Sequence, residues 1–160
     1  MEINETQFKA WEKTVDVQMH FNDLCLRLRS YGISILGVLL GAAAIAYRYA
    51  GIVEVYCFKI HTSAIFLVIS IIVWLAFYIM DRFWYHELLR GAVQHGRRLE
   101  VALKDAVPDI GLAQSIRNAS HSSLNINAAK KLNIFYLSIL FVQLIGLAVL
   151  LSGAVRVATS

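Results

Sequence analysis

The chain has 160 residues, of which 58% are hydrophobic, and its formal net charge is +4 at pH 7. A composition this apolar excludes an ordinary water-soluble domain, and the hydrophobic residues fall in long blocks. Basic residues flank those blocks, which is typical of membrane topology signals and argues against a nucleic-acid partner. The sequence therefore predicts an all-α membrane protein whose first partner is the lipid bilayer.

The first predicted element is a cytoplasmic amphipathic helix over residues 4–30. Polar side chains recur along it every three or four positions and share one stripe, at Lys9, Lys13, Asp16, His20, Asp23 and Arg27. The rest of its circumference is largely apolar, so the helix can bury more than half of its surface. Two interpretations stay open: a helix lying in the membrane interface, or a helix packed between partners in an oligomer.

A first transmembrane span is predicted over residues 31–50. Small residues share one face of this helix, at Ser34, Gly37, Gly41 and Ala44. Such residues let two membrane helices approach closely, so the face predicts a helix contact, either within one subunit or between subunits.

The second span, residues 62–80, carries no charged residue, and its helical pattern continues into the cytoplasm as far as residue 107, before Pro108. The extension has one charged face and one apolar face. Gly91 and Gly96 lie on the apolar face, where a partner backbone can approach, and the N-terminal helix is the expected partner. The fold class is thus three transmembrane helices, an N-terminal cytoplasmic helix and a long second helix extending into the cytoplasm.

Two polar residues interrupt the apolar face of the extension. For His95 we weigh a buried, hydrogen-bonded side chain in a subunit contact against a switch that responds to pH or to a ligand. For Asp81, at the inner membrane boundary, we weigh an ion pair or helix cap against a cation-attracting ring at a pore mouth.

Residues 108–131 are the least regular part of the sequence. A short helix is expected around Leu112 and Ile116, followed by a polar loop over residues 118–127. The last span covers residues 132–155 and contains Gln143, which either hydrogen-bonds across a helix interface or lines a pore.

The distribution of the 15 lysines and arginines predicts the topology. The segments before the first span and between the second and third spans carry all of them except Arg48, Lys59 and Arg156. Under the positive-inside rule the N-terminus is cytoplasmic and the C-terminus periplasmic, within one membrane domain spanning residues 1–160. Cys25 and Cys57 then lie on opposite sides of the membrane, so no intrachain disulfide is expected.

No catalytic pattern stands out in the sequence. The stretch HELLR at residues 86–90 resembles the zinc-protease pattern HExxH, but Arg90 occupies the place of the second histidine. Glycine-rich phosphate loops and a nucleophile elbow are also missing from the sequence. We therefore expect no enzyme activity, no metal and no cofactor.

Residues 80–100, MDRFWYHELLRGAVQHGRRLE, follow directly on a span. This stretch resembles the junction motif of small octameric bacterial inner-membrane proteins of the RipA-like type. The layout is also similar to that of SLATT-type membrane effectors of bacterial anti-phage systems. The resemblance implies a ring-shaped homo-oligomer in the bacterial inner membrane, one that kills or arrests an infected cell.

Two functions follow from this reasoning. The first is a homo-oligomeric pore-forming or membrane-disrupting effector, an ion channel with a role in antiviral defence, whose cytoplasmic helical layer senses a trigger protein or ligand. The alternative is a structural or regulatory membrane scaffold that conducts nothing.

Overall fold

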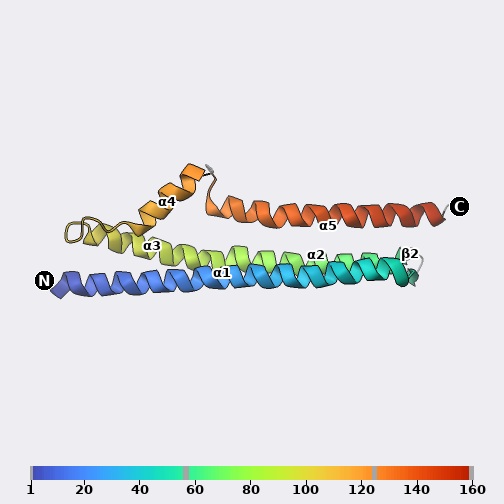
Figure 1. Ribbon diagram of the computed structural model, residues 1–160, viewed down its shortest axis with the longest axis horizontal. Coiled ribbons are helices and arrows are strands. Elements are labelled where there is room, and N and C mark those ends of the chain that lie inside the picture. The colour runs from blue at the N-terminus through green and yellow to red at the C-terminus, as the bar shows by residue number, and fades with distance from the viewer. Residues whose placement is uncertain (1, 56–57, 124–125, 159–160) are drawn as a thin grey trace. The chain divides into compact units, whose positions relative to one another are not determined.

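The computed structural model describes residues 2–55, 58–123 and 126–158 (Figure 1). Its helices are α1 (Glu2–Tyr49), α2 (Thr62–Met80), α3 (His86–Leu103), α4 (Leu112–Ser123) and α5 (Ala128–Ala158). A turn of π-helix, η1 (Asp81–Tyr85), joins α2 to α3, and two short strands, β1 (Ile52–Val55) and β2 (Phe58–His61), follow α1. Helix accounts for 87% of the structure, so the predicted all-α class is confirmed.

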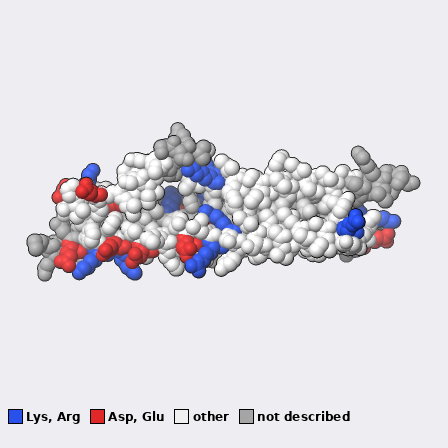
Figure 2. Space-filling view, viewed as in Figure 1, with Lys and Arg blue, Asp and Glu red and all other residues white. Residues whose placement is uncertain are grey.

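Three helices in the described part of the chain are long and apolar enough to cross a membrane: Glu5–Tyr49, Thr62–Leu103 and Ala128–Ser152. The 19 residues of α2 include no charged side chain, and they span ~28 Å at 1.5 Å per residue, close to the hydrocarbon thickness of a bilayer. Figure 2 shows a broad stretch of surface without charged residues. The chain therefore has the make-up of a multi-pass membrane protein.

The contacts divide the chain into two compact units. Unit 1 comprises Met1–Arg27 and Met80–Leu132, and unit 2 comprises Leu28–Ile79 and Asn133–Ser160. Each unit is described separately below.

The N-terminal helix predicted over residues 4–30 is not a separate element, because α1 runs unbroken from Glu2 to Tyr49. Its sequence contains no proline, so no residue within the helix lacks the amide that donates to the carbonyl four positions earlier. The long second helix also continues from Thr62 but ends at Leu103 rather than at residue 107. The Val107 amide donates to the Leu103 carbonyl over 2.8 Å, closing a turn before Pro108.

The segment between the first two apolar helices folds as a β-hairpin. Strands β1 and β2 pair antiparallel, and Glu54 lies opposite Lys59 with 3.3 Å between the carboxylate and the ammonium. Gly51 precedes the hairpin with φ of 67°, a backbone conformation that side chains with a Cβ disfavour. The Thr62 amide donates to the Gly51 carbonyl over 3.1 Å, which ties the start of α2 to the turn that follows α1.

The polar loop predicted over residues 118–127 is wrong in its first part, because α4 continues to Ser123. Serine and asparagine have only modest helix propensity, but local side-chain bonds support this helix. Ser115 Oγ donates to the Gly111 carbonyl over 3.0 Å, and Gln114 Nε2 donates to Asn118 Oδ1 over 3.0 Å. Intrinsic propensity was therefore a poor guide here.

The π-helical turn η1 lies within the second long helix. Asp81 at its start is fully buried, Trp84 is 67% exposed and Tyr85 is half-buried. Because Tyr85 is four positions after Asp81, the less exposed face continues through the turn at ordinary helical spacing.

Candidate functional sites of the two units

In unit 1, α1 and α3 pack as an antiparallel pair. Gln18 Nε2 donates to the Ala92 carbonyl over 3.1 Å, and Trp11 Nε1 donates to Glu100 Oε1 over 3.4 Å. Gly96 is buried in this seam, where an added Cβ would meet the Gln18 amide and lie 3.4 Å from Thr14 Cγ2. Glycine at this position therefore lets the two helices approach closely.

Glu100 connects three helices of unit 1. Its side chain projects from α3, is only 7% exposed, and accepts from Trp11 of α1. The Ala113 amide, in the first turn of α4, donates to the same carboxylate oxygen over 3.0 Å. A carboxylate suits this place because the first amides of a helix lack intrahelical acceptors and carry partial positive charge. No motif in the sequence indicates this role for Glu100.

Asp81 and His95, the two polar residues predicted to interrupt the apolar face of the extension, lie in different surroundings. Asp81 is fully buried at the first position of η1. His95 is exposed in the single chain, outside the seam with α1. Gly91 is also exposed, with no described atom within 4 Å of an added Cβ. Of the two glycines predicted to receive a partner backbone, Gly96 alone contacts α1.

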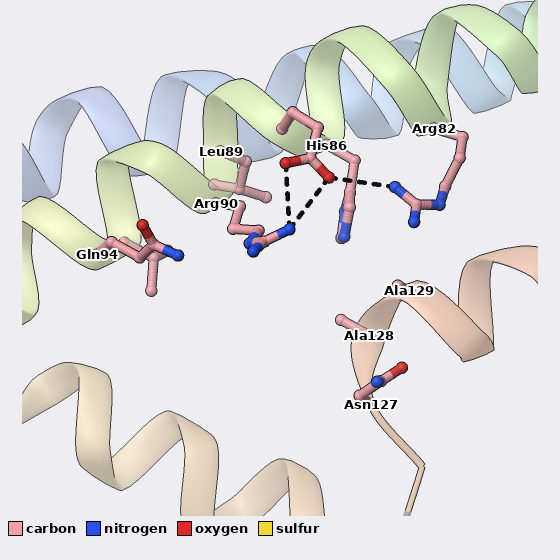
Figure 3. Close-up of a pocket in the computed structure, with 10 residues that line it drawn as sticks. Arg82, His86, Leu89, Arg90, Gln94, Asn127, Ala128 and Ala129 are labelled. Carbon is pink, nitrogen blue, oxygen red and sulfur yellow. Dashed lines mark hydrogen bonds and ion pairs between the residues drawn. The ribbon is translucent and has the colours of Figure 1, made fainter.

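A cavity of about 590 Å³ lies in unit 1 between α3 and the first turn of α5 (Figure 3). Basic side chains form one wall, with Arg82, His86 and Arg90 extending from η1 and α3. Glu87 lies between the two arginines, at 3.2 Å from Arg82 Nη1 and 3.3 Å from Arg90 Nη1. The opposite wall is formed by residues 127–129, where α5 begins.

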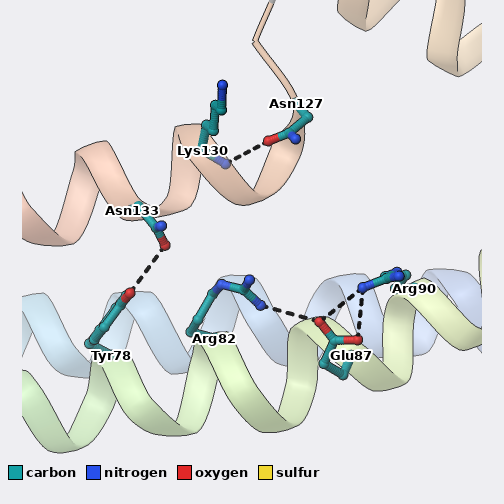
Figure 4. Close-up of polar contacts among 7 residues, drawn as sticks. All are labelled: Tyr78, Arg82, Glu87, Arg90, Asn127, Lys130 and Asn133. Atoms are coloured by element: carbon teal, nitrogen blue, oxygen red, sulfur yellow. Dashed lines mark hydrogen bonds and ion pairs between the residues drawn. The ribbon is translucent and has the colours of Figure 1, made fainter.

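The first turn of α5 is capped by Asn127 (Figure 4). Asn127 Oδ1 accepts from the Lys130 amide over 2.9 Å, the arrangement of an N-cap residue. The amides of Ala128 and Ala129 have no intrahelical acceptor in this geometry. The loop predicted from the sequence includes Asn127, and no motif in this segment indicates that it lies near the arginines of α3.

In unit 2, buried polar contacts join α2 and α5 in antiparallel orientation. Ser70 Oγ lies 3.1 Å from Gln143 Oε1, and Trp74 Nε1 donates to the Tyr136 carbonyl over 3.0 Å. Toward the end of α2, Tyr78 Oη donates to Asn133 Oδ1 over 3.2 Å (Figure 4). Gln143 is thus placed in a helix–helix contact and is 3% exposed, and its Nε2 has no hydrogen-bond partner among the described residues.

The predicted small-residue face of α1 is directed outward in unit 2. Ser34, Gly37, Gly41 and Ala44 are all exposed, and no described atom lies within 4 Å of an added Cβ at either glycine. The inward face is instead formed by Gly32, Leu36, Ala43 and Ala46. A Cβ at Gly32 would lie 3.3 Å from the Phe77 ring, so this glycine sets the approach of α1 to α2.

The remaining candidates for chemistry are few. Within the described ranges, no group of three or more His, Cys, Asp or Glu side chains lies close enough to hold a metal ion. Cys25 is buried, and Cys57 lies outside the described residues. Comparison of the chain with protein-family models, with curated protein sequences and with solved structures found no match. The resemblance of residues 80–100 to RipA-like and SLATT-type proteins therefore stays a prediction.

Proposed function

We propose that this chain is a self-assembling protein of the bacterial inner membrane, in which copies associate through a face of α1 that a single copy leaves exposed. The positive-inside rule supports a cytoplasmic N-terminus and a periplasmic C-terminus. The charged helices of unit 1 then form a cytoplasmic layer, and the apolar helices of unit 2 cross the bilayer.

One observation carries the proposal: large apolar side chains are exposed on the charged helices of unit 1. Met19 is 66% exposed and Leu26 is 54% exposed on α1, and Val101 is 71% exposed on α3. Lipid would cover such side chains in the membrane, but in a cytoplasmic layer they face water and favour a protein partner.

A second copy of the chain is the partner that fits best. Met19 and Leu26 are separated from Gly37 and Gly41 by nearly whole helical turns, so all four lie on one side of α1. Gly32 and Leu36, which pack inside the same chain, lie on a different face of the helix. A neighbouring copy could therefore bury the apolar residues in the cytoplasm and pack closely on the glycines in the membrane.

The proposal is tested by measuring the mass of the purified protein in lipid nanodiscs, with Gly41→Leu as the variant. Gly41 has open space around it in the single chain, so the fold accepts leucine while a close helix approach is blocked. The matched control is Ala148→Leu, which adds bulk at an exposed position of α5. We expect Gly41→Leu alone to reduce the subunit number. A monomeric wild-type protein, or an equal loss in both variants, would rule out this interface.

A pore-forming effector of antiviral defence is the second candidate. The observation that favours it is the weakly polar face of Ser34, Gly37 and Gly41, which could border a lumen if several copies met around an axis. Ion flux in liposomes separates this candidate from a scaffold that conducts nothing. A pore predicts that Ser34→Leu lowers flux and that Gln143→Leu, buried against α2, leaves it unchanged. Absence of flux under every trigger tested favours the scaffold.

A further inference from the structure

We propose that the cavity between α3 and the start of α5 binds the phosphate of an anionic phospholipid headgroup. The inference rests on the membrane insertion that is part of the proposed function, but it requires no self-assembly. The cavity volume of about 590 Å³ is in the usual range for small-molecule sites, so a headgroup fits.

The basic wall offers directed donors for a phosphate. A guanidinium has five N–H donors, and Arg82 and Arg90 each use Nη1 toward Glu87. Donors on both side chains remain for a phosphate, which arginine can bind in bidentate fashion. The ion pairs with Glu87 hold the two guanidinium groups at the cavity, and the His86 ring extends toward it between them (Figure 3).

The opposite wall adds a second kind of anion-binding group. The first turn of α5 carries the two amides of Ala128 and Ala129 that lack intrahelical acceptors, together with the positive end of a 31-residue helix. Lys130 and Lys131 follow directly in the sequence. Against these groups, Glu87 is the only acidic side chain among the described residues that line the cavity.

The position of the cavity along the chain favours a lipid over a free anion. Arg82 follows α2, the uncharged span, after a single intervening residue, and the uncharged stretch of α5 begins just after Lys131. Charged residues that flank two spans lie at the depth of the headgroups. Phe83 and Trp84, both about two-thirds exposed beside the cavity residues, are suited to the same interfacial layer.

The test uses the full chain in nanodiscs, with bound lipids counted by native mass spectrometry after mixing phosphatidylglycerol with phosphatidylcholine. The variant is Arg82→Gln with Arg90→Gln. Its matched control is Arg97→Gln with Arg98→Gln, which removes the same charge from exposed positions of α3 outside this cavity. We expect the preference for phosphatidylglycerol to fall about tenfold in the first pair and to stay near the wild-type value in the second.

Two further measurements separate the role of charge from that of geometry, and a lipid headgroup from a free anion. Arg82→Lys with Arg90→Lys keeps the charge but loses the bidentate geometry of the guanidinium groups. We expect its preference for phosphatidylglycerol to lie between that of the wild type and that of the glutamine pair. Circular dichroism checks that the helices of this variant are intact. Inorganic phosphate is titrated into phosphatidylcholine nanodiscs. Phosphate binding without phosphatidylglycerol enrichment would overturn the lipid headgroup in favour of a free anion.

Equal losses in both glutamine pairs, or no loss in the first pair, would show nonspecific surface attraction and overturn the site. Failure of membrane insertion shows itself separately, as absence of the protein from the nanodiscs. Failure of self-assembly shows itself in the subunit mass and leaves the lipid count interpretable.

Discussion

The amide of Ala113 donates to the buried carboxylate of Glu100 over 3.0 Å, so one side chain of α3 caps the start of α4. The same oxygen accepts from Trp11. Glu100→Ala leaves both donors without their acceptor, and we expect it to lower the free energy of unfolding by about 1–3 kcal/mol. Denaturation followed by circular dichroism in detergent measures the change.

Glu100→Gln separates the capping geometry from the charge. The amide oxygen of glutamine can still accept from both donors, but its interaction with the positive end of α4 is weaker than that of a carboxylate. We therefore expect Glu100→Gln to lower the free energy of unfolding by only about 0.3–1 kcal/mol. The control is Asp105→Ala, at an exposed position, which should be near neutral. Hydrogen exchange should show faster exchange in the first turn of α4 for Glu100→Ala, and unchanged exchange there would contradict the capping role.

The two glycines of α3 should respond differently to the same substitution. In Gly96→Leu, the new side chain meets the Gln18 amide and Thr14, displaces the hydrogen bond to Ala92 and overpacks the seam. We expect a loss of about 1–3 kcal/mol in thermal unfolding. In Gly91→Leu, the new side chain has open space around it, and leucine is a better helix former than glycine. We therefore expect this substitution not to destabilise the fold. Equal effects of the two substitutions would mean that α1 and α3 do not pack as described.

Gln143→Leu should change the stability of unit 2 by less than about 1 kcal/mol, because hydrogen bonds between membrane helices average about 0.6 kcal/mol. The substitution removes a buried Nε2 that has no partner among the described residues, and Ser70 Oγ keeps its 2.8 Å bond to the Leu67 carbonyl. Loss of helicity during a denaturing detergent titration measures the effect. A loss above 2 kcal/mol would indicate a second partner for the glutamine, such as a bound water or a neighbouring copy.

His95→Leu should leave membrane insertion and the unfolding midpoint unchanged, because the side chain is exposed and outside the α1 seam. If His95 lies in a contact between copies, the subunit mass in nanodiscs changes although the fold does not. Unchanged mass and unchanged activity would make His95 a tolerated surface residue and exclude it as a switch.

The three long apolar helices were predictable because the length of an uncharged segment is read directly from the sequence. The role of each residue in α3 and η1 was not, since the type of a side chain does not show whether it is buried. Glu100 is charged but lies one turn from the buried Gly96 and is only 7% exposed, whereas the apolar Trp84 is 67% exposed. The basic cavity depends on the first turn of α5 lying near Arg82 and Arg90, a long-range contact for which the sequence holds no signal.

The π-helical turn at Asp81–Tyr85 also bears on how this chain can change in length. A single-residue deletion there would convert the wide turn into an ordinary α turn without breaking the helix. Because the extra residue is absorbed within the wide turn itself, the helix downstream would keep its orientation, and Gly96 and Glu100 would keep their partners on α1. The turn is therefore a place where the second long helix can lose one residue while the contacts of α3 are retained.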